Sequence, residues 1–216
     1  MVFEIKKFEG IISTVEEFEL FRTSVGTPSE RAANKVISFI DEHVSEFISN
    51  SPFLTMATAN SEGQCDVSPR GDHPGFVSVI DEQHLFIPER PGNKRMDSAQ
   101  NIITNPNIGL IFLIPGLGET LRVNGKAYIC RDPELLEMSA VNGRVPLFGI
   151  LVEVQECYVH CAKALIRSSL WKPDLWPEKE TLPSVPQMLV DHAKIPNVTS
   201  EEVAKSLQEG YVNRLY

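Results

Sequence analysis

CDVSPRGD at positions 65–72 and PERPGNKR at positions 88–95 are two cationic corners that set the fold of this chain. Glycine and proline punctuate both, as is typical of tight turns between strands. Between them lie two short apolar segments, 76–80 and 84–88, which predict adjacent antiparallel strands. Rigid turns carrying Arg, Ser and free backbone N–H groups suit a phosphate better than a packed core. The corners therefore predict an anion site.

More strands are expected on both sides of the corners. The pattern predicts them at 53–59, 64–68, 108–114, 120–130 and 148–158. Gly125 is expected to mark a bulge in the fourth of these segments. Six or seven short strands with few helices favour a small closed or partly closed antiparallel barrel over a parallel sheet.

Helices are expected around this barrel. The capping sequence at 27–30 predicts an amphipathic helix over 27–48, and shorter helices are expected at 96–103, 132–139, 162–171 and 199–210. The domain organisation that follows is an N-terminal helical extension packing on the barrel (1–50), the barrel with its following helix (51–171), and a Pro-rich tail with a short helix (172–216).

Composition narrows the class of protein. A length of 216 residues, 42% of them hydrophobic, is enough for one well-buried domain. A net charge of −9 argues against a nucleic-acid binder, so local basic clusters indicate a small anionic ligand. The first ten residues lack an apolar signal core, and no apolar run reaches the roughly 18 residues of a membrane span. With four cysteines and no C-x-x-C pair, a cytoplasmic protein with reduced thiols and no membrane association is expected.

The candidate phosphate ligands come from both corners. Ser68 and Arg70 offer a hydroxyl and a guanidinium, and Asn93 and Arg95 add an amide and a second guanidinium, the donor set that neutralises a phosphate monoester. The alternative is that they are solvated hairpin ends making surface ion pairs.

These motifs resemble the flavin-binding split barrel of the pyridoxamine 5'-phosphate oxidase-like family. The likeness runs from Phe53 to Trp176 and rests on SPRG at 68–71, the corner at 88–95, NP at 105–106 and LRVNGKA at 121–127. A branch of probable FMN-dependent enzymes is the nearest in pattern, because PGNKR at 91–95 and CAKALIRSSLW at 161–171 match its recurring motifs.

The resemblance implies a six- or seven-stranded antiparallel split barrel, mainly β (α+β), with FMN bound at the interface of a homodimer. Arg70 and Arg95 would hold the phosphate, while the backbone of Val67 to Arg70 and of Ile87 and Pro88 would line the flavin ring. The expected activity is that of an oxidoreductase passing hydride between a reduced donor and a small organic acceptor at the flavin. The expected cofactor-binding residues are Val67, Ser68, Arg70, Ile87, Pro88, Asn93, Arg95, Lys163, Arg167 and Trp171.

Several residues and the function itself have more than one possible interpretation. Lys163 and Arg167 share a helix face that could meet an anion or lie on the surface, and Trp171 could cover the flavin or pack in the helix core. No catalytic residue is assigned, and a metal site is not expected, because on a strand His160 points away from its neighbouring thiols. The segment 210–216 departs from that oxidase's substrate-holding segment, so the oxidase reaction itself is not expected. The alternative function is a non-catalytic module that binds or stores flavin or haem. The pattern does not distinguish FMN from a deazaflavin, nor one electron donor from another.

Overall fold

The computed structural model describes residues 8–216, and the chain divides into two units at the Val36–Ile37 bond. The smaller unit holds α1 (Val15–Val25) and α2 (Glu30–Asn34). A capping box starts α1: Thr14 Oγ1 accepts a hydrogen bond from the Glu17 N–H, and the Glu17 carboxylate accepts one from the Thr14 N–H. Neither helix buries a side chain. The first seven residues of the predicted extension 1–50 lie outside the described residues.

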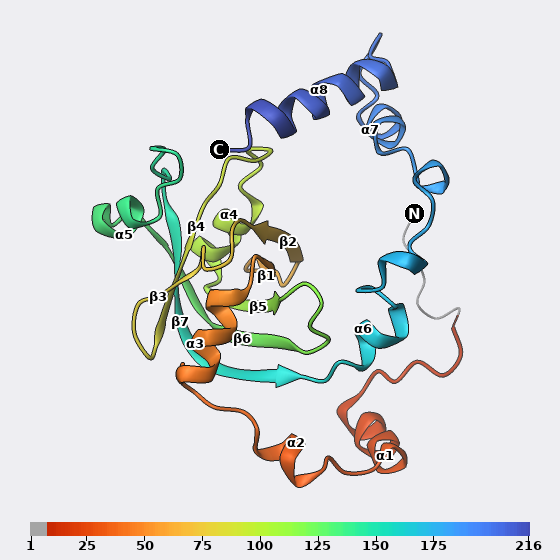
Figure 1. Ribbon diagram of the computed structural model, residues 1–216. Coiled ribbons are helices and arrows are strands. Elements are labelled where there is room, and N and C mark those ends of the chain that lie inside the picture. Colours follow the sequence, from red (N-terminus) through yellow and green to blue (C-terminus); the bar gives the residue numbers. More distant parts are fainter. Residues whose placement is uncertain (1–7) are drawn as a thin grey trace. The chain divides into compact units, whose positions relative to one another are not determined.

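Residues 37–216 carry a seven-stranded antiparallel sheet with the strand order β2-β1-β5-β6-β7-β4-β3 (Figure 1). The strands are β1 (Phe53–Ala59), β2 (Cys65–Gly71), β3 (Ser78–Val79), β4 (His84–Pro88), β5 (Asn107–Leu113), β6 (Thr120–Cys130) and β7 (Gly149–His160). This sheet, with its flanking helices, confirms the predicted α+β split barrel. The predicted bounds of β1, β4 and β6 are correct, and the others shift by no more than three residues at either end.

Ion pairs bring the two sides of the sheet together. Arg70 of β2 donates from Nη1 to the carboxylate of Glu89, which follows β4. Arg90 Nε donates to Asp72 Oδ2 over 2.6 Å. β2 forms one edge of the sheet and β4 lies next to the opposite edge, so these two pairs, here called the seam, close the barrel through side chains.

The core lies inside the barrel, under α3 (Glu42–Asn50) and α4 (Asp97–Thr104). Alternate residues of the strands face it, as the period of two in a pleated strand requires. Val44 and Ile48 of α3 and Ile102 of α4 pack into the same cluster. Burying one such side chain stabilises the fold by about 1.5–3 kcal/mol, so α3 and α4 are held to the sheet mainly by apolar contact.

Gly125 interrupts the register of β6 against β7, which confirms the expected bulge. The register shifts between Asn124 and Gly125. A Cβ atom at Gly125 would lie 2.0 Å from the backbone oxygen of Glu153, closer than any side chain tolerates. The absence of a side chain therefore lets the backbones of β6 and β7 approach closely at this point.

The predicted helix over 27–48 is wrong, because two shorter helices and an extended segment replace it. Ile37 pairs with Cys157 of β7 through backbone hydrogen bonds of 3.1 and 2.7 Å. The side chain of Asp41 then starts α3 by accepting from the Val44 N–H over 2.8 Å. The apolar spacing was compatible with one helix, but the pairing of Ile37 with the sheet and the strong N-cap at Asp41 interrupt it.

The C-terminal part contains more helix than the sequence pattern indicated. It holds α5 (Pro133–Met138), α6 (Lys163–Ser168), 3-10 turns at Pro173–Leu175 and Lys179–Thr181, α7 (Val185–Ala193) and α8 (Ser200–Asn213). α7, which was not predicted, starts at a Ser184 cap with proline in its first turn and packs against α8. Among the described residues, no helix combines the length and apolarity needed to cross a bilayer.

Candidate anion-binding site

A chain of hydrogen bonds joins β2 to the start of α4. Arg70 Nε donates to Ser68 Oγ over 3.3 Å, and Ser68 Oγ lies 3.2 Å from Ser98 Oγ. Arg70 and Ser68 point the same way because they are two positions apart on one strand. Ser98, in the first turn of α4, is only 5% exposed and was not assigned a role from the sequence. The signal was present, since Ser98 comes three residues after the last residue of the second corner, in the first turn of the helix expected there.

The N-terminus of α4 has no side-chain cap. Its N-cap position is Met96, which takes a left-handed backbone conformation with φ 63°, and Lys94 has φ 62°. Such angles are uncommon for residues other than glycine. Asn93 stabilises this turn, because its Oδ1 accepts from the Arg95 N–H over 3.0 Å. Uncapped N–H groups at a helix start carry partial positive charge and attract anions.

Arg95 reaches the same helix end from the second corner. Its Nε donates to Asp97 Oδ2 over 2.7 Å, and this hydrogen bond raises the pKa of the guanidinium above its usual value. The pair is open to solvent, with 71% of the Arg95 side chain and 40% of the Asp97 side chain exposed. Arg70 and Arg95 thus stand at one helix N-terminus, connected through Ser68, Ser98 and Asp97. We call these residues, together with Asn93, the cradle.

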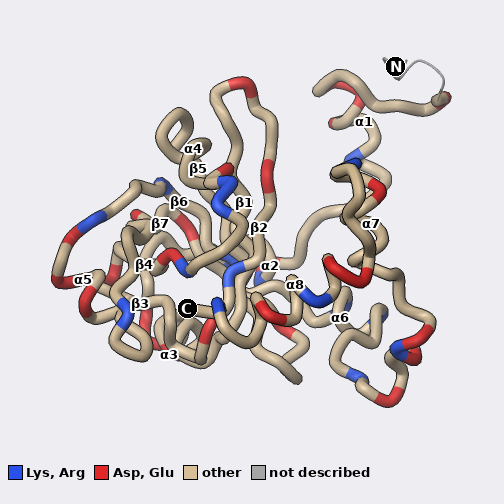
Figure 2. Tube along the Cα trace, turned by 90° about the horizontal axis from the view of Figure 1, so that it is seen from above, with Lys and Arg blue, Asp and Glu red and all other residues tan. Residues whose placement is uncertain are grey.

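Carboxylates balance the charge of the cradle. Glu89 pairs with Arg70, and Asp66 Oδ2 accepts from Asn101 Nδ2 over 2.8 Å. The Asn101 amide also donates to Thr58 Oγ1 over 3.1 Å, which anchors α4 to β1. Figure 2 shows acidic and basic residues interspersed along the trace rather than gathered on one cationic surface. The positive charge of the cradle is therefore confined to two guanidinium groups, each of which is paired with a carboxylate.

A second polar network lies directly beside the cradle. The side chain of Asp72 is 2% exposed and accepts from Arg90 Nε, from the His73 N–H over 2.8 Å and from Tyr216 Oη over 2.6 Å. Burial alone would raise the pKa of Asp72, but the hydrogen bonds from Tyr216, His73 and Arg90 together hold it below its usual value. Arg90 Nη1 also donates to the backbone oxygen of Ser139 over 2.9 Å. Sequence patterns gave no sign that Tyr216 reaches this network.

The other predicted site residues fall in two places. Val67 lies on β2 with 69% of its surface exposed, whereas the Ile87 side chain is in the core and Pro88 is buried, so only their backbone could face a ligand. α6 carries Lys163 and Arg167, and Trp171 follows it. Trp171 Nε1 donates to the backbone oxygen of Leu117 over 2.8 Å. Within residues 8–216, no hydrogen bond or ion pair connects α6 or Trp171 with Arg70 or Arg95.

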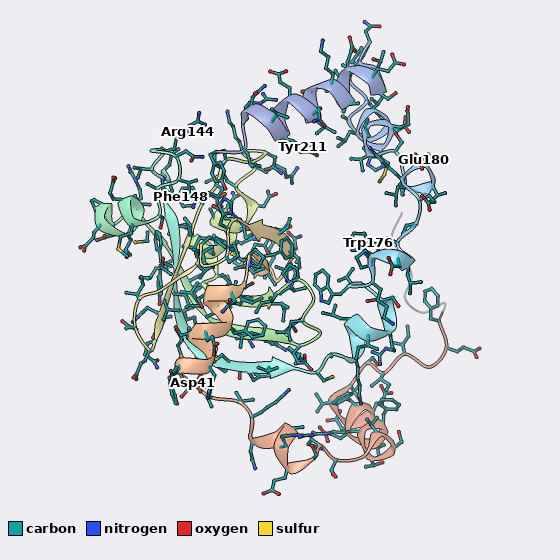
Figure 3. All side chains as sticks on the ribbon, in the orientation of Figure 1. Asp41, Arg144, Phe148, Trp176, Glu180 and Tyr211 are labelled. Atoms are coloured by element: carbon teal, nitrogen blue, oxygen red, sulfur yellow. The ribbon has the colours of Figure 1, made fainter. Side chains whose placement is uncertain are left out.

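An apolar hollow of about 360 Å³ opens next to the cradle. It is lined by Met96 and Ala99 at the start of α4, Ile129 and Arg131 at the end of β6, and Leu147 and Phe148 before β7. Phe148 is labelled in Figure 3. Met96 directly follows Arg95, so this hollow and the cradle share one turn of chain.

The thiol of Cys157 is structural. It is fully buried, its Sγ donates to the backbone oxygen of Phe39 over 3.1 Å, and burial raises its pKa to about 11. A thiol in this state is neutral and unreactive near neutrality. The described residues contain no group of three or more His, Cys, Asp or Glu side chains placed to hold a metal ion.

Solved structures with a similar course of chain include HupZ of Group A Streptococcus, with 18% identity, 55% of this chain and 91% of that chain covered, and a TM-score of 0.45. Others are the haem storage protein HutZ of Vibrio cholerae (14% identity, 56% and 94% covered, TM-score 0.41) and an F420 reductase (17% identity, 56% and 98% covered, TM-score 0.39). No curated protein matches the chain.

The family model described as pyridoxamine 5'-phosphate oxidase matches residues 40–161. The matched range starts just before α3 and includes every strand of the sheet and both corners. It also includes the whole of α4, whose N-terminus forms the cradle. Because this range is more than half of the sequence, the chain belongs to the pyridoxamine 5'-phosphate oxidase family.

Proposed function

We propose that this protein binds FMN through its phosphate at the cradle and acts as an FMN-dependent oxidoreductase. The observation that carries the proposal is the placement of Arg70, Ser68, Ser98 and Arg95 around the uncapped N-terminus of α4. Hydroxyl and guanidinium donors at a helix start suit a phosphate monoester. Membership of the family supports the choice of a flavin phosphate over other phosphate esters.

The donors that are already engaged still leave room for a phosphate. A guanidinium has five N–H donors, and Arg70 uses one for Ser68 and one for Glu89. Among residues 8–216, the ion pair of the Arg95 side chain is the exposed one with Asp97, and exposed pairs are worth at most about 1 kcal/mol. A dianion can therefore draw Arg95 away from Asp97 at small cost.

The chemistry would reside in the cofactor. Bound FMN supplies hydride transfer at its ring, and the protein contributes binding, orientation and electrostatics. The exposed strand face at Val67 offers backbone N–H and C=O groups to a flat ring, and the apolar hollow beside Met96 offers room for a small organic acceptor. We assign no residue of this chain a proton-transfer role.

A second copy of the chain would complete the site. Lys163, Arg167 and Trp171 lie apart from the cradle within one chain, which is compatible with a role toward the cofactor of a partner copy. Val67, Leu113 and Tyr158 lie on strands with partly exposed outer faces that a partner could cover. Sedimentation velocity at two protein concentrations tests this part: a species of twice the chain mass, 48 kDa from 24.1 kDa, is expected, and a strict monomer contradicts it.

We place the protein in the cytoplasm, where the four cysteines, none of which forms a disulfide, would stay reduced.

The experiment that tests the cofactor is a spectrum of freshly purified protein, followed by a fluorescence titration with FMN. A flavin spectrum and saturable quenching are expected, whereas a Soret band would support the haem-binding alternative. Arg95→Ala should weaken FMN binding by at least about tenfold, the effect of losing one charge-assisted hydrogen bond. Arg22→Ala is the matched control, because Arg22 is an exposed arginine of α1 that pairs with Glu19. Equal FMN affinity in both variants would refute the role of the cradle.

Oxidoreductase activity needs a separate measurement. The FMN-loaded protein is mixed anaerobically with NADH or NADPH, and bleaching of the flavin absorbance is followed. Bleaching with either donor supports the enzyme, while a flavin that neither donor reduces supports a storage function.

A further inference from the structure

The polar network beside the cradle includes a residue from the far end of the sequence. Tyr216 Oη donates to one oxygen of Asp72 over 2.6 Å, and Arg90 Nε donates to the other oxygen over 2.6 Å. The Arg90 guanidinium also lies 5.8 Å from the centre of the Tyr216 ring, within reach of a cation–π contact. Tyr216 is 144 residues from Asp72, so only the tertiary fold brings them together.

This network holds the same two strand ends that present the cradle. Asp72 follows Arg70 by two residues, and Arg90 directly follows Glu89, the partner of Arg70. The side chains of Asp72 and Arg90 are 2% and 17% exposed, so their hydrogen bonds are largely shielded from water. If Asp72 moved, Arg70, which is only two residues away on the same backbone, would therefore move with it.

A second attachment fixes the same end of the chain. Arg144 Nη1 donates to the backbone oxygen of Tyr216. Figure 1 shows the end marked C beside the loop that follows β4, and Figure 3 labels Arg144 near it. The segment after α8 is thus held both by its tyrosine side chain and by its backbone.

We propose that Tyr216 is a positioning residue for the cradle: through Asp72 and Arg90 it holds the two corners in the arrangement that presents Arg70 to an anion. The inference rests on the proposed function only for the identity of that anion. Among the described residues, no hydrogen bond or ion pair joins Tyr216 to the cradle, so it would act on binding through the seam.

The test uses Tyr216→Phe in the full chain, which removes the hydroxyl and keeps the ring. Tyr211→Phe is the matched control, because Tyr211 lies on α8 with 64% of its surface exposed and makes no hydrogen bond or ring contact among the described residues. Hydrogen exchange is measured at the Asp72, His73 and Glu89 amides, which donate to Pro52 O, Asp72 Oδ1 and Phe148 O. FMN and, separately, inorganic phosphate are titrated into each variant.

Exchange at these amides should rise by about tenfold in Tyr216→Phe, the equivalent of one lost hydrogen bond to a charged group. FMN and phosphate should bind several-fold more weakly, and the melting temperature should fall by no more than about 6 °C below that of the Tyr211→Phe control, as one lost hydrogen bond predicts for a chain of this size. Unchanged exchange overturns the proposal. Faster exchange with unchanged affinity for both ligands also overturns it, because Tyr216 would then fasten the chain without positioning the site.

The two proposals fail in different ways. If the wild-type protein takes up no FMN, the proposed function fails, and the inference about Tyr216 is decided by exchange and by phosphate binding. If the wild type binds FMN and Tyr216→Phe behaves as the control does, only the inference about Tyr216 fails.

Discussion

Replacing Asp97 with asparagine should tighten the binding of FMN. In the cradle, the Asp97 carboxylate occupies Arg95 Nε at 2.7 Å and would compete with a phosphate for the same guanidinium. Asparagine keeps the size of the side chain and removes the charge. A purely structural role for Asp97 predicts the opposite result, since acidic residues in the first turn of a helix stabilise it by about 0.3–1 kcal/mol.

The size of the effect follows from charge and distance. With Arg95 between them, the Asp97 carboxylate and a bound phosphate of charge near −2 would lie about 6 Å apart. Because 40% of the Asp97 side chain is exposed, a water-like dielectric applies, and the repulsion is about 1.4 kcal/mol. FMN should therefore bind Asp97→Asn about tenfold more tightly at low salt, and only about threefold more tightly at 0.15 M, where the Debye length is about 8 Å.

The assay is an FMN fluorescence titration of both proteins at low and at physiological ionic strength. Asp191→Asn on α7 serves as control, because it removes an equal charge from a residue whose partner is Gln187. Equal or weaker FMN binding by Asp97→Asn at low salt would refute the placement of the phosphate beside Arg95. A gain of the same size in Asp191→Asn would show that net charge alone is responsible.

Two predictions concern the scaffold. Gly125→Ala should lower the free energy of unfolding by more than about 2 kcal/mol, because its Cβ would lie 2.0 Å from Glu153 O; Gly92→Ala, whose Cβ would meet no atom closer than 4.0 Å, should change it little in the same urea titration. The raised pKa of Cys157 means that the unfolded chain ionises this thiol at lower pH than the folded chain does. The contribution of this thiol to the free energy of unfolding should therefore be fully present below pH 9.0 and be lost as the pH rises toward about 11. Cys157→Ala should flatten this part of the plot of unfolding free energy against pH. A wild-type profile no steeper than that of the variant would contradict the assignment.

The strands were predictable because each shows a local signal. β6 alternates over residues 120–127, β4 is a short apolar run between turns, and Gly125 interrupts a regular pattern. The prediction of one helix over 27–48 was wrong because apolar spacing alone does not show where a stronger N-cap or a strand pairing interrupts a helix. Asp41 inside that segment is a better cap than Thr27, and Ile37 finds a backbone partner on β7 that no local pattern reveals.

In the candidate site, too, local features could be predicted and tertiary contacts could not. Ser68, Arg70, Asn93 and Arg95 could be selected from their residue types and turns. The Ser68–Ser98 contact and the Arg70–Glu89 pair could not, because they depend on where α4 and the end of β4 meet β2. The contact between Tyr216 and Asp72 was even harder to predict, because it depends on the positions of all the elements between these two residues.

The seam makes one side of the barrel different in kind from the rest. Backbone ladders join the other strands, whereas this side is held by charged side chains whose burial leaves them screened by salt much less than exposed ion pairs are. Removal of one charge, as in Glu89→Gln or Asp72→Asn, should therefore loosen the molecule along this line before it disturbs any other. A cofactor that arrives as a dianion would compete with Glu89 for Arg70, so loading would leave Arg90 and Asp72 as the pair that closes the barrel.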